Sequence, residues 1–176
     1  LDLLNIGFVS HQRQDDIAKK TVGHFSSILP ITLQTKQHVS FIQWVKGVNH
    51  LLAVHLKNHT NISLSKTSST DIIFNYKPYQ FNMFAGAPIS VKSLDTTQQI
   101  KILALNAFDF DATGNLILAF DCVLDVFSEV KPQYFIENFM AYLDAILENP
   151  EQKIYQIPLM SDRAYHDILE ASAGAN

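Results

Sequence analysis

The sequence predicts an α/β fold, a mixed sheet with helices packed on it, and three observations lead to this prediction. Short runs rich in β-branched and aromatic residues, such as residues 4–9 and 70–76, are typical of strands. Two longer segments, residues 40–57 and 132–148, repeat apolar residues at intervals of three and four, which is typical of helices with one buried face. Hydrophobic residues make up 47% of the 176 positions and charged residues 17%, so the chain has enough apolar surface for a sizeable core.

The composition also argues against several classes of protein. The net charge is −4 and Lys19-Lys20 is the only adjacent basic pair, so nucleic acid is not expected as a partner. The single Cys122 excludes an intrachain disulfide and a cysteine-based zinc site. No apolar run reaches the roughly 18 residues that span a bilayer, and no secretory signal opens the chain. We therefore expect a cytoplasmic protein without a membrane partner, and the start at Leu1, almost directly in a strand, suggests a piece of something longer.

The first part of the chain is expected to form two strands joined by a polar loop. The first strand covers residues 4–9, and the loop contains Arg13 and one helical turn at residues 17–21. The residues alone leave Arg13 open as a solvated loop cation or a functional group. Gly23 then permits a bend that a Cβ would obstruct, and an apolar strand follows from Phe25. Because Pro30 has no N–H to donate, this strand must lie at a sheet edge or be bulged there.

The helix predicted at residues 40–57 begins at a good capping residue. Ser40 can accept a hydrogen bond from the first free N–H groups, an effect of about 1 kcal/mol. Gly47 costs the helix about 1 kcal/mol relative to Ala, which the long apolar stripe outweighs. His55 and His59 lie four apart, as a metal pair on a helix requires, but no third ligand is evident and we predict no metal site. The apolar stripe consists of Phe41, Trp44, Val45, Val48, Leu51, Leu52 and His55.

The middle of the chain is rich in strand signals. A Ser/Thr-rich loop at residues 65–70 precedes the strand at 70–76, which Pro78 ends. Asp109, Asp111 and Gly114 in the turn at residues 109–114 resemble the pattern of a calcium loop. Phe120 occupies the position of the required bidentate Glu, so we predict a hairpin turn instead. Three further strands are expected at residues 89–94, 99–108 and 115–123.

The last part of the chain is predicted to be helical. Pro132 suits the first position of a helix, which runs over residues 132–148 before Pro150. Ser161 can cap a final short helix through Leu169. Small and polar residues at 171–176 suggest a linker or terminal tail.

Several of these segments resemble the second half of condensation domains from nonribosomal peptide synthetases. The matches occur in the family's order and cover the chain from about residue 4 to 169. They comprise Arg13 in a loop that usually carries Gly-Arg, the VGxFxNTLP segment at Val22, Gly23, Phe25, Leu29 and Pro30, the histidine of HQDxPF at His59, and the FDVxFNY strand at Asp71, Phe74, Asn75 and Tyr76. Gln12 replaces the usual glycine, and only the histidine of HQDxPF survives, which leaves any inherited role of His59 in doubt.

The resemblance implies a chloramphenicol-acetyltransferase-like half-domain over residues 1–170, the C-terminal subdomain within the condensation/epimerisation superfamily. That family carries its activity in an HHxxxDG motif of the first half, and this sequence has no adjacent histidine pair, so the chain alone is expected to be inactive. Its implied role is to shape the substrate tunnel, which Asn75 or Tyr76 would face, and the carrier-docking surface. It would bind no cofactor directly, because phosphopantetheine arms of carrier domains hold the substrates. Its implied partners are the N-terminal half, carrier domains and neighbouring synthetase modules.

Two alternatives from other classes stay open. One is a fragment of a stand-alone acyltransferase of the same fold that uses coenzyme A or another acyl carrier. The other is a non-catalytic condensation-like module that binds partners. For an isolated half-domain we expect exposed apolar surface that normally meets the partner half, and a bare sheet edge, for which residues 70–76 are the candidate strand.

Overall fold

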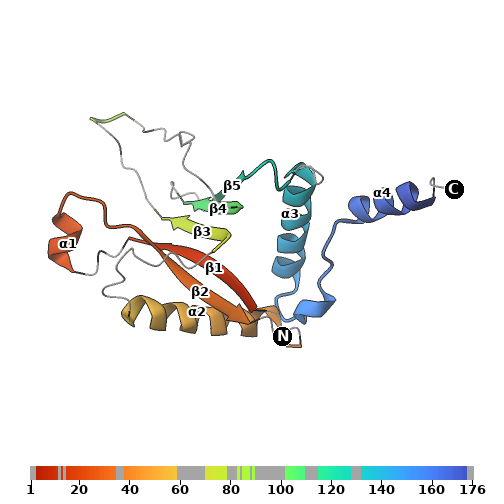
Figure 1. Ribbon diagram of the computed structural model, residues 1–176, viewed down its shortest axis with the longest axis horizontal. Helices are drawn as coiled ribbons and strands as arrows, with labels where there is room; N and C mark the ends of the chain where they lie inside the picture. Colours follow the sequence, from red (N-terminus) through yellow and green to blue (C-terminus); the bar gives the residue numbers. More distant parts are fainter. Residues whose placement is uncertain are drawn as a thin grey trace. The chain divides into compact units, whose positions relative to one another are not determined.

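The computed structural model describes residues 3–11, 13, 15–34, 38–58, 70–78, 83, 85–87, 89, 102–109, 115–127 and 132–173 (Figure 1). The chain divides into two compact units, which we describe separately. The sheet unit comprises Asn5–Thr32 and His59–Val123, and the helical unit comprises Leu1–Leu4, Leu33–Asn58 and Leu124–Asn176. His59, the Ser/Thr-rich loop apart from Thr70 and the hairpin turn apart from Asp109 lie outside the described residues. The strand expected at 89–94 also lies outside them, apart from Ile89.

A mixed sheet of five strands, in the order β2-β1-β3-β4-β5, confirms the predicted fold class (Figure 1). β3 pairs in parallel with β1 and with β4, whereas β4 and β5 form the predicted antiparallel hairpin. Parallel neighbours need long crossover connections, which is why β1 and β3 are far apart in the sequence. The strands are β1 (Leu3–Ser10), β2 (Ser27–Gln34), β3 (Ile72–Lys77), β4 (Leu103–Phe108) and β5 (Ile117–Cys122).

Pro30 lies on β2, which is an edge strand of the described sheet, the first of the two positions that its missing N–H allowed. Alternate β2 residues Leu29, Ile31 and Leu33 are only 1%, 3% and 8% exposed, the period of two expected for a strand with one buried face. The expectation that residues 70–76 form a bare edge is wrong, because β3 lies between β1 and β4. A β-rich run identifies a strand, but the crossover connections decide its neighbours.

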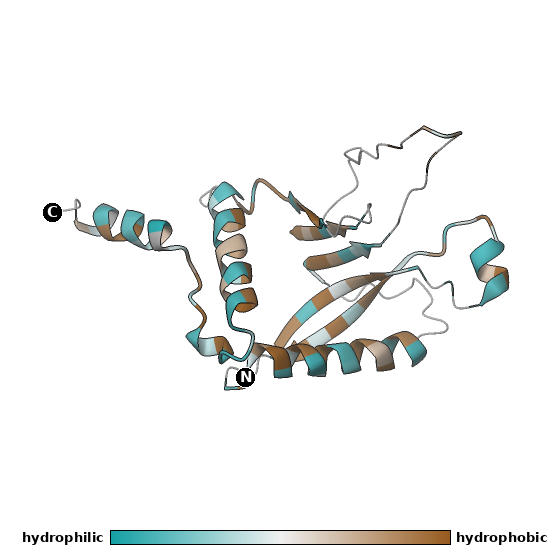
Figure 2. Ribbon diagram, turned by 180° about the vertical axis from the view of Figure 1, so that it is seen from behind, coloured by the Kyte–Doolittle hydropathy of each residue, from teal (hydrophilic) through white to brown (hydrophobic). Residues whose placement is uncertain are grey.

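Helix α2 (Phe41–Asn58) begins with the predicted cap at Ser40. The Gln43 N–H donates to Ser40 Oγ over 3.4 Å, and the Gln43 side-chain oxygen accepts from the Ser40 N–H over 3.4 Å, a reciprocal capping box. The whole predicted stripe is half-buried, and Gly47 lies on the exposed side. Hydrophobic and hydrophilic residues accordingly alternate in bands along α2 (Figure 2).

Backbone contacts tie the start of α2 to the segment that follows α3 (Pro132–Glu148) within the helical unit. The first N–H groups of a helix have no partner inside it, and here the N–H groups of Phe41 and Ile42 donate to Gln152 O and Pro150 O over 3.1 and 3.0 Å. Pro132 opens α3 as predicted, and Ile146 is the buried residue of its apolar stripe.

The end of the chain contains a short 3-10 helix, η1 (Ile154–Gln156), and helix α4 (Asp162–Ala173). The Ala164 N–H donates to Ser161 Oγ over 3.2 Å, which confirms the predicted cap. α4 continues past Leu169, so residues 171–173 of the predicted tail are helical. Alanine has the highest intrinsic helix propensity, so its small size alone does not indicate an irregular tail. Within the described part of the chain, no helix is long and apolar enough to cross a bilayer.

Candidate functional site

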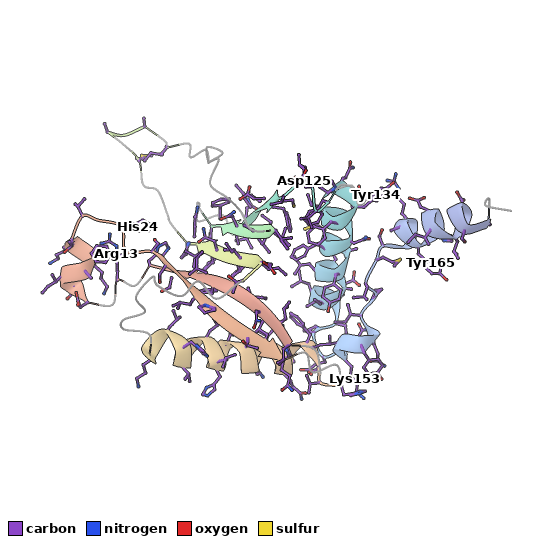
Figure 3. All side chains as sticks on the ribbon, viewed as in Figure 1. Arg13, His24, Asp125, Tyr134, Lys153 and Tyr165 are labelled. Carbon is purple, nitrogen blue, oxygen red and sulfur yellow. The ribbon has the colours of Figure 1, made fainter. Side chains whose placement is uncertain are left out.

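Arg13 lies in the loop beside the first short helix, and its side chain donates to the backbone of that loop (Figure 3). A short helix, α1 (Asp16–Lys20), is capped by Asp15, whose carboxylate accepts from the Ala18 N–H over 2.6 Å. The Arg13 guanidinium donates to the carbonyl oxygens of Ala18, of Thr21 at 2.7 Å and of Gly23 at 3.0 Å. Arg13 is therefore no freely solvated cation, because it closes the loop that carries α1.

Gly23 and Phe25 complete this cluster. The Arg13 guanidinium carbon lies 4.3 Å from the centre of the Phe25 ring, a cation–π contact. A Cβ on Gly23 would lie 3.2 Å from the Phe25 ring, so the absence of a side chain lets the ring approach the backbone. Three residues matched from two separate motifs thus contact one another, while Val22 between them is fully exposed.

A second group of polar side chains crosses three strands of the sheet unit. Asn75 Nδ2 donates to Asn106 Oδ1 over 3.0 Å, and Asn106 Nδ2 donates to Asp121 Oδ2 over 2.8 Å. Asn75 lies directly opposite Asn106. Asp121 lies opposite Ala104, which is two residues from Asn106 along β4 and on the same face of the sheet. We call Asn75, Asn106 and Asp121 the amide relay.

The carboxylate fixes the direction of the amide relay. An ionised carboxylate only accepts hydrogen bonds, so Asn106 must turn its NH₂ group towards Asp121 and its oxygen towards Asn75. Asn75 must then turn its own NH₂ group towards Asn106. Its oxygen, Oδ1, is left at the far end, buried and without a hydrogen-bond donor among the described residues.

The other residues of the β3 motif have different surroundings. Phe74 packs against Phe8 on the opposite face, with ring centres 5.9 Å apart. Tyr76 also alternates to that face, so Asn75 and Tyr76 do not converge on one space. The Tyr76 hydroxyl donates to Asp109 over 3.3 Å, and the pKa of Tyr76 is raised by desolvation and then by the charge and hydrogen bond of Asp109. Asp71 acts through its backbone, because its carbonyl accepts from the N–H groups of residues 102 and 103.

The helical unit contains an open groove of about 350 Å³ that the sequence did not indicate. Its polar group, Asn138, is engaged, because its Oδ1 accepts from the Ser161 N–H over 3.1 Å. Burial raises the pKa of Tyr142 in this groove. The lining residues are Phe135, Asn138, Phe139, Tyr142 and Leu159.

Sequence reasoning also missed Asn106 and Asp121. The available signal was a polar residue within each of two apolar strands, but only the register shows that both side chains reach Asn75. Where the structure describes the chain, no group of three or more His, Cys, Asp or Glu residues is placed to hold a metal ion. His59 lies outside that part.

Comparisons with known proteins give one consistent result. The family model "Condensation domain" matches residues 2–169. The hybrid PKS-NRPS synthetase apdA of Emericella nidulans is 22% identical over 97% of this chain, and the hybrid PKS-NRPS synthetase opdA of Penicillium oxalicum is 20% identical over 99%. The chain spans 5% of the length of each of these two relatives.

Solved structures share the fold at low sequence identity. The first condensation domain of the CDA synthetase has a TM-score of 0.68 at 16% identity over 90% of this chain, and the condensation domain of the monacolin K polyketide synthase MokA has 0.64 at 18% over 86%. A chain of the complex of the X-domain and OxyB from teicoplanin biosynthesis has 0.69 at 15% over 91%. This chain spans 38% of each of these three. With its mixed sheet and helices, and a family match over residues 2–169, the chain belongs to the condensation-domain family.

Proposed function

We propose that this chain is the C-terminal half of a condensation domain in a nonribosomal peptide synthetase or a hybrid polyketide–peptide synthetase. The observation that carries the proposal is a family match over residues 2–169 in a chain that spans only 38% of solved condensation-domain chains. The motif matches from Arg13 to Tyr76 follow the order of the second half, and the HHxxxDG motif of the first half is absent from the sequence.

The proposed reaction is amide-bond formation between two thioesters, each held on the phosphopantetheine arm of a carrier domain. The amine of the acceptor attacks the carbonyl carbon of the donor thioester. A C–N bond forms, the C–S bond breaks, and the proton lost by the amine ends on the departing thiol. This half contributes a tunnel wall and part of the carrier-docking surface, so its role is to position the reactants rather than to transfer the proton.

The test uses the full-length synthetase that carries this chain, with donor and acceptor groups loaded on its carriers. Mass spectrometry of the acceptor carrier should show its mass increased by the donor acyl group. A matched reaction supplies the donor acyl group on coenzyme A and omits the donor carrier. Its rate distinguishes a stand-alone acyltransferase from a condensation domain. Transfer from coenzyme A at an equal rate, or no transfer in either reaction, would contradict the proposal.

A non-catalytic binding module is the second candidate function. The likeness to a chain of the X-domain and OxyB complex favours it, because that structure is a complex between two proteins. This candidate predicts that the full-length protein forms no amide in the loaded-carrier reaction and yet retains a protein partner in co-purification.

A further inference from the structure

We propose that Asp121, acting through Asn106, holds Asn75 so that Asn75 Oδ1 accepts a hydrogen bond from the amine of the acceptor substrate. This inference rests on the proposed condensation function. It makes Asn75 the contact residue, and Asp121 a positioning residue that never touches the substrate.

The geometry of the amide relay fixes the orientation of the Asn75 side chain. An asparagine amide offers a donor on one side and an acceptor on the other, and the two ends have similar shapes. The Asp121 carboxylate removes this ambiguity for Asn106 at 2.8 Å, and Asn106 removes it for Asn75 at 3.0 Å. The two amides therefore point in the same sense, and the chain of hydrogen bonds runs from a negative charge to a carbonyl oxygen.

Asn75 Oδ1 lacks a hydrogen-bond donor among the described residues, which indicates that a ligand supplies one. Buried polar atoms nearly always have partners, and an unpaired one destabilises the protein. Asn75 Oδ1 is buried and has no donor in the part of the chain that the structure describes. Because the oxygen is buried, bulk water does not compete for it.

The chemistry of the relay selects the kind of donor. Hydrogen bonds in series polarise one another, so the Asp121 carboxylate makes Asn75 Oδ1 a stronger acceptor than an isolated amide oxygen. Such an oxygen suits an N–H donor and disfavours carboxylate and phosphate groups. The neutral amine, which is the nucleophilic form in condensation, offers such an N–H donor.

A purely structural role is the competing explanation, in which the relay only holds β3, β4 and β5 together. The two explanations predict different behaviour when Asp121 becomes neutral. In Asp121→Asn the new amide can donate to Asn106, and both amides of the relay can then reverse. The strands stay bridged, but the direction of the relay is no longer fixed, so Asn75 can present NH₂ as well as oxygen and discrimination of the ligand is weakened.

The experiment measures binding of small thioesters to the full-length protein. The probes are alanyl, leucyl and phenylalanyl N-acetylcysteamine thioesters, each paired with the analogue that lacks only the amine. The proposal predicts that the wild-type protein binds at least one aminoacyl thioester about tenfold or more tightly than its analogue, the effect of one good hydrogen bond to a strong donor or acceptor. Asp121→Asn should reduce this ratio below about threefold, and thermal unfolding should show that the variant remains folded.

Two further variants make the test specific. In the double variant Asn75→Asp with Asp121→Asn the hydrogen bonds are restored in the reverse direction, with the carboxylate at position 75. This variant should keep the amine preference but form amide more slowly at neutral pH, because a carboxylate favours the ammonium form. Asn5→Ala is the matched control, because Asn5 hydrogen-bonds Thr32 over 2.7 Å on the same sheet and does not contact the relay.

The outcomes separate this inference from the proposed function. The inference is wrong, and the relay only structural, if the wild-type protein forms the amide between loaded carriers and Asp121→Asn leaves both the amine preference and the amide-forming rate unchanged. If Asp121→Asn does not fold, the same comparison is made with the double variant. An equal loss of amine preference in Asn5→Ala would also overturn it. If the protein neither condenses its carriers nor distinguishes any of the amines, both the inference and the proposed function are wrong.

Discussion

Replacing Arg13 by alanine should loosen the loop that carries α1. Arg13 donates to three backbone carbonyls and stacks 4.3 Å from the centre of the Phe25 ring. Because the contacts are partly exposed, each hydrogen bond contributes about 0.5 kcal/mol and the cation–π contact about 0.5–1 kcal/mol. The free energy of local opening should fall by about 2 kcal/mol, which corresponds to about 30-fold faster exchange of the protected amides.

Hydrogen exchange measured by mass spectrometry on peptides from residues 15–25 tests this prediction. The reporter amides are Lys19, which donates to Asp15 O over 3.0 Å, and Thr21, which donates to Ala18 O over 3.3 Å. Arg13→Lys is the matched control, because lysine keeps the charge but lacks the planar fork, and its exchange should be intermediate. Peptides from α3 should be unaffected. A change below about threefold in Arg13→Ala would refute the role of Arg13 as the residue that closes this loop.

Three further predictions concern stability. Gly7→Ala places a Cβ 2.7 Å from Ile28 Cγ2 and should lower the Tm by about 4–8 °C through overpacking. A Cβ at Gly47 meets nothing within 4 Å, so Gly47→Ala should raise the Tm by about 2 °C. Equal shifts of the two variants in a thermal melt would contradict the packing around Gly7. The raised pKa of Tyr142 means that its stabilising contribution is complete below pH 10 and is lost as the pH rises through the folded-state pKa. Tyr142→Phe should remove a late step from an ultraviolet tyrosinate titration, and removal of a step at or below about pH 10 would contradict burial of the hydroxyl. Ser161→Ala should cost about 1 kcal/mol by removing the cap of α4, and an unchanged urea midpoint and circular dichroism spectrum would argue against that cap.

Local features were predictable because their causes lie within a few residues. Ser40 and Ser161 cap helices through N–H groups three residues away, and Pro132 opens α3 because a first helical position needs no N–H. The missing N–H of Pro30 restricted β2 to a sheet edge or a bulge, and β2 is an edge strand of the described sheet. The family resemblance of the matched segments is confirmed by the match over residues 2–169.

Contacts between distant segments were not predictable in the same way. Asn75 and Asn106 are 31 residues apart, and Asn106 and Asp121 are 15 apart, so the amide relay exists only in the strand register. The central place of β3 depends on two crossover connections that leave no local signal. The sequence left Arg13 open as a solvated loop cation or a functional group, because a backbone carbonyl, unlike a carboxylate, is not visible as a partner in a sequence. The tunnel-facing roles of the matched residues and the assignment of residues 1–170 to one subdomain stay predictions.

We propose that this chain is one half of a condensation domain and acts only with the other half. The most direct measurement is to produce the chain and the roughly 200 residues upstream of it in the parent protein separately, and to mix them with loaded donor and acceptor carriers. We predict that light scattering detects a complex of the two halves, and that mass spectrometry detects the amide only in the mixture. Amide formation by this chain alone, or by the upstream half at an undiminished rate without it, would contradict the claim.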